Sequence, residues 1–511
     1  MEVWLVALFT LLLSASIHFL TRKKSSLPPG PLAVPFLGNL LWLRYSLSDL
    51  EPLLRGLHRK HGPVVTLRIG SRPTIFVSDR GVAHRVLVEH GAAFSDRPAP
   101  LSATRFISSN QHIISSGAYG PLWRLLRRNL MSEILHSSRV KLYSHGRDWV
   151  LGVLTGHLYS QSRSSEDGSV VAKDSFQFAM FCLLVLMCFG EKLDEKAIRE
   201  IEAAQRSLLL YTRKLNVLRF LPAVTKHVYR CRWRTALDMR KRQTEICLPL
   251  IEARREHRRR RQQQDTEEEE ERFVYSYLDS LLDIKLPEEG GRGLTEDEMV
   301  SLCSEFLTAG TDTTSTALQW IMAELVRNKD VQDKLFGEID STTSKGGGAV
   351  KEEELHKMPY LKAVVLEGLR RHPPAHFVLP HAVTEEVEIE GYVIPKDATI
   401  NFMVAEMGWD EKVWEEPMEF KPERFLSGGS AEGVDITGSR AIKMMPFGVG
   451  RRICPGLGLA MLHLEYFVAN LVREFEWREV EGQEVDLSEK PEFTTVMKYP
   501  LRARLVPRRI C

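Results

Sequence analysis

The sequence predicts a mainly α-helical fold with a minor β region. Two short runs near the N-terminus, residues 63–70 (PVVTLRIG) and 74–78 (TIFVS), are separated by SRP and indicate a β-hairpin. Most later segments place their apolar residues at helical intervals and carry capping residues at their ends. No repeat of fixed period is visible. The expected fold is therefore a helical body with a small sheet.

Length and composition predict a folded chain with a large core. Its 511 residues are 43% hydrophobic and 27% charged, a balance typical of globular proteins. The formal net charge is only +2, so nothing global indicates nucleic-acid binding. Seven cysteines, an odd number without a C-x-x-C pair, disfavour a disulfide framework and favour a reducing compartment.

One local run, residues 252–272, changes sharply from basic to acidic. The basic part alone would suit nucleic acid, but the adjacent glutamates would repel phosphate. Cations are also favourable at the C-terminal end of a helix. We therefore expect a solvated helix end and loop there, and no nucleic-acid partner.

The N-terminal segment predicts a membrane anchor. Residues 3–20 (VWLVALFTLLLSASIHFL) carry no formal charge and, as a helix, would extend roughly 27 Å, enough to cross a bilayer core. A cleaved signal peptide would need basic residues before this run, and only methionine and glutamate precede it. Arg22, Lys23 and Lys24 follow it instead, which predicts that the rest of the chain is cytosolic.

These features divide the chain into three parts. Residues 1–24 are the expected anchor with its basic stop, and they contact the lipid bilayer in a single pass. Residues 25–39 are a hinge, because the prolines in SSLPPGPLAVP fix φ and break any helix. Residues 40–511 form one large domain.

A long helix is predicted to begin with a capping box of Thr295 and Glu298. Its middle, residues 308–316 (TAGTDTTST), holds one strong helix former, Ala309, and Gly310 costs about 1 kcal/mol relative to alanine. This composition predicts a local opening of the backbone ladder, where hydroxyls and a carboxylate can bind carbonyls, water or a small ligand. Tight helix packing at small residues is the alternative that the residues leave open.

A second helix is predicted over residues 358–374 (MPYLKAVVLEGLRRHPP), with a proline near its start and two after its end. Glu367 and Arg370 lie three positions apart and can pair on one face. Apolar neighbours indicate that this face is partly buried. A further arginine, Arg424, is expected in a loop within FKPERF (residues 420–425).

The segment 446–456 (PFGVGRRICPG) surrounds one cysteine with glycines and prolines. Gly448 and Gly450 permit a backbone close to whatever the sulfur binds. Pro455 suits the first position of the apolar helix that follows. Cys454 is therefore predicted at a helix N-terminus, where the dipole and free amides lower the pKa of a thiol.

Such a thiolate has two possible uses. It could be a nucleophile, as in a cysteine hydrolase, although no partnering histidine is evident near it. It could also be a soft metal ligand, for which one thiolate suffices when a macrocycle supplies the other ligands. The loop alone leaves this choice open.

The cysteine loop resembles the haem-binding loop of the cytochrome P450 family. The pattern F-x-x-G-x-R-x-C-x-G is met by Phe447, Gly450, Arg452, Cys454 and Gly456. Other motifs resemble the family in the same order along the chain, and the sequence is most similar to plant microsomal A-type members. They are LPPGPLAVPFLGN (27–39), WRLLRR (123–128), A-G-x-D-T-T (309–314), E-x-x-R (367–370), P-E-R-F (422–425) and FTTVMKYPL (493–501).

The resemblance implies that residues 40–511 are a catalytic domain with the P450 fold and a b-type haem, iron protoporphyrin IX. Cys454 would be the axial ligand of the iron, and Phe447 would shield its sulfur. The expected haem-binding residues are Trp123, Arg127, His381, Phe447, Gly448, Gly450, Arg452 and Gly456. Of these, Trp123, Arg127 and Arg452 would bind the haem propionates. His381 stands where many members have an arginine, so its propionate contact would depend on protonation.

The resemblance also assigns roles on the long helix. Thr313 and Asp312 would deliver protons during oxygen activation, while Ala309 and Gly310 would leave space over the iron. The Glu367, Arg370 and Arg424 side chains would form a structural network rather than a catalytic group.

The implied reaction is monooxygenation, in which one atom of O2 enters a small organic molecule and the other is reduced to water. By the same resemblance the substrate pocket is lined by residues 97–119, 306, 377–379 and 496–497, which are largely apolar and fit a lipophilic or aromatic substrate. No G-x-G-x-x-G fingerprint follows a predicted strand. Electrons are therefore expected from a separate NADPH-cytochrome reductase in the same membrane, the endoplasmic reticulum, in a role typical of plant secondary metabolism.

Two alternative functions keep the same cysteine. A haem-thiolate isomerase or dehydratase would need no reductase, but it would have little use for an Asp-Thr pair. A non-catalytic membrane haem sensor would give no role to residues 308–316.

Overall fold

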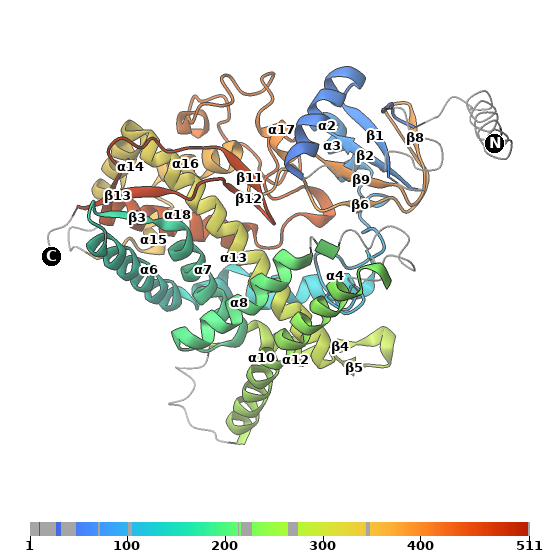
Figure 1. Ribbon diagram of the computed structural model, residues 1–511, viewed down its shortest axis with the longest axis horizontal. Coiled ribbons are helices and arrows are strands. Elements are labelled where there is room, and N and C mark those ends of the chain that lie inside the picture. The colour runs from blue at the N-terminus through green and yellow to red at the C-terminus, as the bar shows by residue number, and fades with distance from the viewer. Residues whose placement is uncertain are drawn as a thin grey trace, which may run out of the picture.

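The protein is described by a computed structural model that covers residues 10, 27–31, 47–69, 72–100, 105–212, 214–215, 227–263, 274–343 and 348–508. Helices make up most of the body, the main sheet lies at one side of it, and a second, smaller sheet lies at the opposite side (Figure 1). This arrangement confirms the predicted mainly α fold with a minor β region. The predicted anchor, apart from Thr10, and most of the hinge lie outside the described residues.

The main sheet joins distant parts of the chain. β1 (Val64–Ile69) and β2 (Arg72–Val77) form the expected antiparallel hairpin. β9 (Thr399–Phe402) pairs in parallel with β2, and β6 (His381–Ala382) pairs antiparallel with β9. The strand order is therefore β1-β2-β9-β6, so the N-terminal hairpin is completed by residues that lie shortly before the cysteine loop.

Helix α13 (Glu296–Arg327) runs through the centre of the helical body (Figure 1). It packs along α7 (Ala172–Phe189) and against α16 (Pro359–Arg371) and α18 (Leu457–Glu474). These four helices form most of the core around which the site is built.

The start of α13 is as predicted, but its middle is not. The Thr295 side chain accepts the Glu298 N–H, and the Glu298 carboxylate accepts the Thr295 N–H, which completes the capping box. The helix then continues without interruption through residues 308–316, so the predicted opening of the backbone is wrong. The small residues serve packing instead, because a Cβ on Gly310 would lie 2.6 Å from Leu184 Cδ1 of α7.

Helix α7 is the most apolar of the core helices. Among the residues that the structure describes, it is the one helix long and apolar enough to cross a membrane. It is also 89% buried, between α13 and α6 (Ser144–Ser164). Its composition is therefore explained by its place in the protein core.

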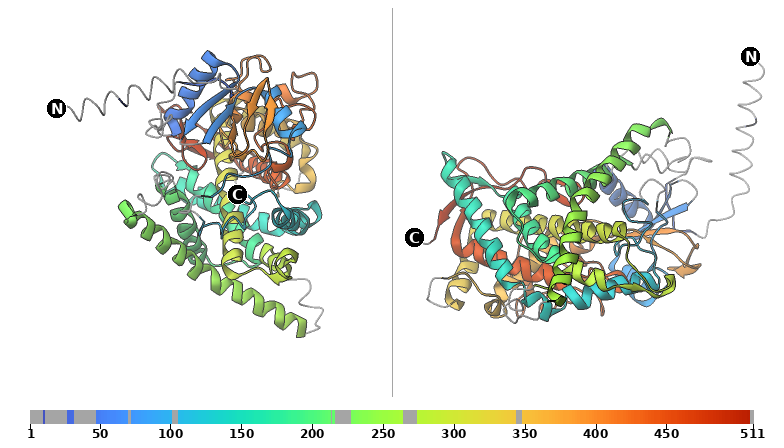
Figure 2. Two further views of the ribbon diagram at one scale, coloured as in Figure 1. Left: turned by 90° about the vertical axis from the view of Figure 1, so that its right-hand side faces the viewer. Right: turned by 90° about the horizontal axis from the view of Figure 1, so that it is seen from below.

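The remaining elements surround this core, and Figure 2 shows the long α10 on the outer side of the body. The other α-helices are α2 (Leu47–His61), α3 (Arg80–His84), α4 (Pro121–Asn129), α5 (Ser137–Lys141), α8 (Glu195–Thr212), α10 (Arg230–Gln263), α12 (Tyr277–Asp283), α14 (Lys329–Thr342), α15 (Glu352–Leu355) and α17 (Val404–Gly408). Shorter helical turns are η2 (Arg85–Glu89), η3 (Leu130–Ile134), η5 (Pro287–Glu289), η6 (Pro422–Phe425) and η7 (Gly450–Arg452). The other strands are β3 (Ser169–Val171), β4 (Lys285–Leu286), β5 (Arg292–Gly293), β7 (Val387–Ile389), β8 (Tyr392–Ile394), β10 (Phe475–Arg478), β11 (Glu489–Pro491), β12 (Thr495–Met497) and β13 (Arg502–Pro507).

The predicted helix end near residues 252–272 is partly described. Helix α10 carries the basic run up to Gln263, the last residue described before residues 264–273, so the end of the helix and the loop after it stay predictions. The acidic part of the run falls within residues 264–273, which lie outside the described residues.

Candidate active site

The cysteine loop is held by its own main chain. Cys454 lies between η7 and α18, and its backbone N–H donates to the Phe447 carbonyl at 2.9 Å. The Gly456 N–H points toward the Cys454 sulfur, and a Cβ on Gly456 would lie 3.8 Å from that sulfur. The loop therefore presents one thiol with an amide donor beside it.

Two glycines give this loop its shape for different reasons. Gly448 and Gly450 have φ values of 68° and 77°, in the left-handed region that favours glycine. A Cβ on Gly450 would also lie 2.2 Å from the Leu87 carbonyl oxygen. Gly450 thus lets the loop pack directly against the main chain of η2, whereas Gly448 is required only for its conformation.

The Cys454 thiol does not have the lowered pKa that the sequence predicts. Burial raises the pKa of Cys454, and the Gly456 N–H and the positive charge of Arg127 only partly oppose this. Helix α18 begins at Leu457, with Gly456 as its N-cap, so Pro455 is not its first residue and the sulfur lies before the first turn. The dipole effect is confined to that turn. The charged form of Cys454 would therefore be stabilised mainly by a bound metal cation.

Three buried or half-buried guanidinium groups lie around this loop, on Arg97, Arg127 and Arg452. Within the described residues, all of their side-chain hydrogen bonds go to main-chain carbonyl oxygens, and none goes to a carboxylate. The shortest bonds run from Arg127 Nη2 to Ile453 at 2.6 Å, from Arg452 Nη2 to Gly117 at 2.6 Å, from Arg452 Nε to Ser95 at 2.7 Å, from Arg97 Nη1 to Leu379 at 2.7 Å and from Arg97 Nε to Ser115 at 2.8 Å.

The electrostatics of these arginines favour an anionic ligand. Burial lowers the pKa of Arg97 to about 9, and repulsion from Arg452 contributes. Burial likewise lowers the pKa of Arg452 to about 10, and it lowers the pKa of Arg127. Desolvated cations that repel one another are stabilised by an anion with several acceptor oxygens.

Arg97 is a site residue that the sequence reasoning missed. The sequence placed it only at the edge of the segment expected to line the substrate pocket. Its Nη1 atom also donates to the Pro380 carbonyl at 3.0 Å, so it lies beside the position where many family members have an arginine. The one signal in the sequence is an arginine in SDRP (residues 95–98), which is too short a pattern to assign a ligand.

His381 occupies the position where many family members have an arginine, but it is uncharged. Its Nδ1 atom lies 2.7 Å from the Phe94 carbonyl oxygen and donates to it. Burial, with a contribution from the positive charge of Arg97, lowers the pKa of His381 to about 3. A propionate contact that depends on protonation of His381 is therefore disfavoured near neutral pH.

Trp123 is buried on α4 between the arginines and the preceding loop. Its indole N–H donates to the Ile114 carbonyl at 3.0 Å. The guanidinium carbon of Arg452 lies 4.2 Å from the centre of its ring. Trp123 therefore supports Arg452 through its aromatic face, while its N–H fixes the loop.

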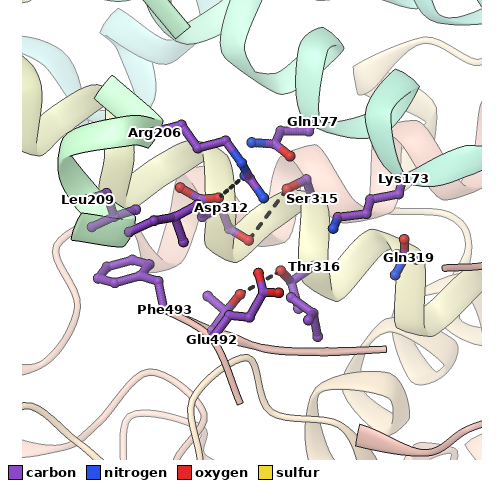
Figure 3. Close-up of a pocket in the computed structure, with 13 residues that line it drawn as sticks. Lys173, Gln177, Arg206, Leu209, Asp312, Ser315, Thr316, Gln319, Glu492 and Phe493 are labelled. Carbon is purple, nitrogen blue, oxygen red and sulfur yellow. Dashed lines mark hydrogen bonds and ion pairs between the residues drawn. The ribbon is translucent and has the colours of Figure 1, made fainter. Parts of the chain in front are cut away.

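The predicted residues on α13 lie on two sides of the helix. Ala309 is exposed, and its carbonyl accepts the Thr313 hydroxyl at 2.7 Å. Asp312 faces a polar pocket, where its Oδ1 lies 3.2 Å from Arg206 Nη1 (Figure 3). Burial raises the pKa of Asp312, although the charge of Arg206 opposes this.

The polar pocket in Figure 3 connects Asp312 with charged groups near the surface. Arg206 reaches it from α8, and Lys173 and Gln177 reach it from α7. Glu492 closes it from the segment between β11 and β12. Thr313 does not line this pocket.

Glu367, Arg370 and Arg424 form the expected structural network. Arg370 donates from Nε to Glu367 Oε2 at 2.7 Å and from Nη2 to Oε1 at 2.8 Å. Arg424 Nε lies 3.3 Å from the same Oε1 atom. The Arg370 Nη1 group also donates to the carbonyls of Gly408 and Pro417, each at 2.7 Å, so the network holds the segment that leads to the cysteine loop.

The residues present fit a haem. The thiol is a soft donor whose charged form needs a cation, and the three guanidinium groups have no carboxylate partner among the described residues. Ala309 adds a small exposed side chain in the middle of a largely buried helix.

Comparison with known proteins settles which family this site belongs to. The sequence pattern of the cytochrome P450 family matches residues 28–505. The chain belongs to the cytochrome P450 family. Members hold a haem iron and take electrons from a reductase driven by NADPH, so this P450 is a haem-thiolate monooxygenase.

Curated relatives and solved structures agree with this assignment. The chain is 48% identical to cytochrome P450 89A9 of Arabidopsis thaliana, over 98% of this chain and 97% of that protein. It is 30% identical to a flavonoid 3'-monooxygenase of Arabidopsis thaliana, over 99% and 98% of the two chains, and 30% identical to a geraniol 8-hydroxylase of Swertia mussotii, over 98% and 97%. A zebra fish cytochrome P450 solved with abiraterone has a TM-score of 0.71 at 21% identity and covers 90% of this chain and 100% of its own, which shows the same fold.

Proposed function

We propose that this P450 oxygenates a small lipophilic or aromatic molecule and that Cys454 would supply the thiolate that holds its haem iron. The observation that carries the proposal is a single thiol, fixed by main-chain bonds to Phe447 and Gly456, beside cations with no carboxylate partner among the described residues. The flavonoid and geraniol named for two relatives are molecules of this general kind.

When bound, the haem supplies the oxygen activation and the electron transfer of the reaction. The protein supplies the binding and the orientation. Arg97, Arg127 and Arg452 would hold the haem propionates by charge-assisted hydrogen bonds. Phe447 packs against the core beside the cysteine loop and shields the sulfur from water, which preserves the electron-rich thiolate.

Thr313 and Asp312 handle the protons. The Thr313 hydroxyl donates its own proton to the Ala309 carbonyl, so its oxygen remains free to accept a bond from a reacting group or water. Asp312 has a raised pKa and faces the polar pocket, which suits a group that takes protons from solvent and passes them inward.

A Thr313→Ala variant tests this role. We expect it to fold normally, because only one exposed hydroxyl bond is lost, but to consume NADPH with less product and more released peroxide. A decrease in coupling of several-fold is expected, measured as product formed per NADPH oxidised. Thr314→Ser, which alters the neighbouring buried threonine and keeps a hydroxyl, is the control. Unchanged coupling in Thr313→Ala would remove Thr313 from the proton path.

We also infer a location and a partner surface. The uncharged run of residues 3–20 and the basic residues after it support a single crossing of the endoplasmic reticulum membrane with the P450 domain in the cytosol. Arg127, Arg128, Lys443 and Arg451 are near the cysteine loop in sequence or space, and we assign them to the contact with the reductase. Charge reversal of Arg128, Lys443 and Arg451, which are not assigned to the haem, should slow reduction and weaken its dependence on salt, and an unchanged rate and salt dependence would remove the assignment.

A carbon-monoxide difference spectrum of the reduced protein is the primary test. Wild type should give the long-wavelength Soret band of a thiolate-ligated haem, and Cys454→Ser should lose that band together with NADPH-dependent turnover. Cys303→Ser, which changes a buried cysteine of α13, should keep both. A colourless wild type after haem supplementation, or full activity in Cys454→Ser, would disprove the proposal. A spin-shift screen with lipophilic and aromatic compounds then identifies the substrate class.

A further inference from the structure

One partly buried carboxylate near the site has no part in the chemistry proposed above. Glu305 lies on α13, one turn before Ala309. Its Oε2 atom accepts the backbone N–H of Ile114 at 2.8 Å, and its Oε1 atom accepts the N–H of Ser115 at 2.6 Å. Both carboxylate oxygens are thus used to hold two successive peptide groups of one loop.

The same short segment, residues 114–117, also binds the cations of the site through its carbonyl groups. Arg97 Nε donates to the Ser115 carbonyl at 2.8 Å. Arg452 donates from Nη1 to the Ile114 carbonyl at 3.3 Å and from Nη2 to the Gly117 carbonyl at 2.6 Å. The segment therefore lies between a carboxylate on its N–H side and two guanidinium groups on its C=O side.

This arrangement is electrostatically consistent. An anion that binds an N–H and a cation that binds a C=O polarise the intervening peptide groups in the same sense, which strengthens each hydrogen bond. Glu305 and Arg97 also attract each other over the longer distance, because each favours the charged form of the other. Glu305 thus offsets part of the repulsion between Arg97 and Arg452.

We infer that Glu305 is a positioning residue for the haem, acting through residues 114–117 to hold the Arg97 and Arg452 guanidinium groups where the propionates bind. It would thus link α13, the helix that carries Asp312 and Thr313, to haem retention. This inference rests on the proposed assignment of Arg97 and Arg452 to the propionates.

A second glutamate of α13 provides a matched control. Glu298 is also near the start of the helix, and its Oε1 atom lies 2.6 Å from Nδ1 of His112, in the same loop. It pairs with Arg292 as well, at 2.8 Å. Glu298 contacts a loop side chain rather than residues 114–117, so its loss should affect stability without moving the guanidinium groups of the site.

The test compares the haem-loaded full chain of wild type with Glu305→Gln, Glu305→Asp, Glu298→Gln and Arg452→Gln. The rate of haem transfer to apomyoglobin is measured for each, together with the thermal unfolding of each protein. In Glu305→Gln one carboxamide nitrogen faces a backbone N–H and leaves it unsatisfied. We expect haem transfer about tenfold faster, with no matching increase in Glu298→Gln.

Glu305→Asp keeps the charge with a shorter side chain, so its transfer rate should lie between those of wild type and Glu305→Gln. If Glu305→Gln fails to fold, Glu305→Asp alone decides, and a rate equal to wild type overturns the inference. A wild-type rate in Glu305→Gln, or an equal increase in Glu298→Gln, also overturns it.

Failure of the proposed function has a different signature. If Arg452→Gln leaves haem transfer unchanged, the propionate assignment itself is wrong. If Arg452→Gln accelerates transfer and Glu305→Gln does not, only the role of Glu305 is wrong.

Discussion

Two groups of arginines in this protein differ in what neutralises them. Arg370 and Arg424 bind the carboxylate of Glu367, and the side chains of Glu367 and Arg370 are both 0% exposed. Arg97 and Arg452 are half-buried, and their described partners are carbonyl oxygens. The first group is neutralised within the chain, whereas the second would be neutralised by the anionic ligand that we propose for it. The charge of its partners therefore separates a structural arginine from a ligand-binding one.

The largest expected effect comes from removing the carboxylate that Arg370 and Arg424 share. Glu367→Gln leaves the buried Arg370 without its carboxylate, so the free energy of unfolding should fall by about 3–5 kcal/mol. Urea denaturation measures this change. Haem should be lost only as a consequence of unfolding.

An exposed ion pair provides the control for that measurement. Glu256 and Arg260 form a surface ion pair on α10 at 2.6 Å, with side chains 60% and 72% exposed. Glu256→Gln should change stability by less than about 0.5 kcal/mol. A similarly small effect in Glu367→Gln would show that the buried group is not structural.

Arg452, which has no carboxylate partner among the described residues, should show the opposite pattern, with a larger effect on haem binding than on stability. Arg452→Gln removes charge-assisted bonds to a ligand, so haem binding should weaken by about 1.5–3 kcal/mol, roughly tenfold to a hundredfold. Stability of the haem-free protein should fall by only about 1 kcal/mol, because the donors that are lost were bonded to neutral carbonyl groups. Haem transfer kinetics and urea denaturation measure the two quantities separately.

The neighbouring Arg451 is the control for that experiment. Its Nη1 group donates to the Tyr119 hydroxyl at 2.6 Å, and the side chain is exposed. Arg451→Gln should leave haem binding within about twofold of wild type. If both variants lose haem equally, the contrast between the two groups of arginines does not hold.

A pH dependence tests whether His381, which lies near the cations Arg97 and Arg452, is held neutral. His381 has a pKa of about 3 when folded, compared with 6.5 for a free histidine. Between these values the unfolded chain binds the extra proton, so the stabilising contribution is complete above pH 6.5 and is lost as the pH falls toward 3. The slope from this residue is at most about 1.4 kcal/mol per pH unit.

His381→Gln keeps a donor for the Phe94 carbonyl and removes the titration. Its stability should therefore fall less steeply than that of wild type from pH 6.5 to 5, as measured by urea denaturation at each pH. Parallel curves for the two proteins would mean that His381 is not held neutral by burial and by Arg97.

The parts of the site that the sequence predicted are those set by local geometry. The β-hairpin, the capping box of Thr295, and the pairing of Glu367 with Arg370 each involve residues close together in the chain, and the structure confirms them. Arg424 joins that pair over 57 positions, and it was found through its resemblance to a family motif.

The errors and omissions depend on long-range packing. The predicted opening of α13 failed because Leu184 of α7 fills the space beside Gly310, which the helix sequence alone does not reveal. The pKa of Cys454 was predicted from its neighbours in sequence, whereas burial decides it. Arg97 was missed because its partner Leu379 lies 282 positions away.

The parallel pairing of β2 with β9 has a consequence for biosynthesis. Val77 pairs with Phe402, so the N-terminal hairpin waits for roughly 325 more residues before its sheet can close. At about 5–20 residues per second, translation of that stretch takes tens of seconds. During that interval the edge of β2 lacks its final neighbour, which makes chaperone protection valuable. The cofactor-binding site can therefore be completely folded only late, after most of the polypeptide has left the ribosome.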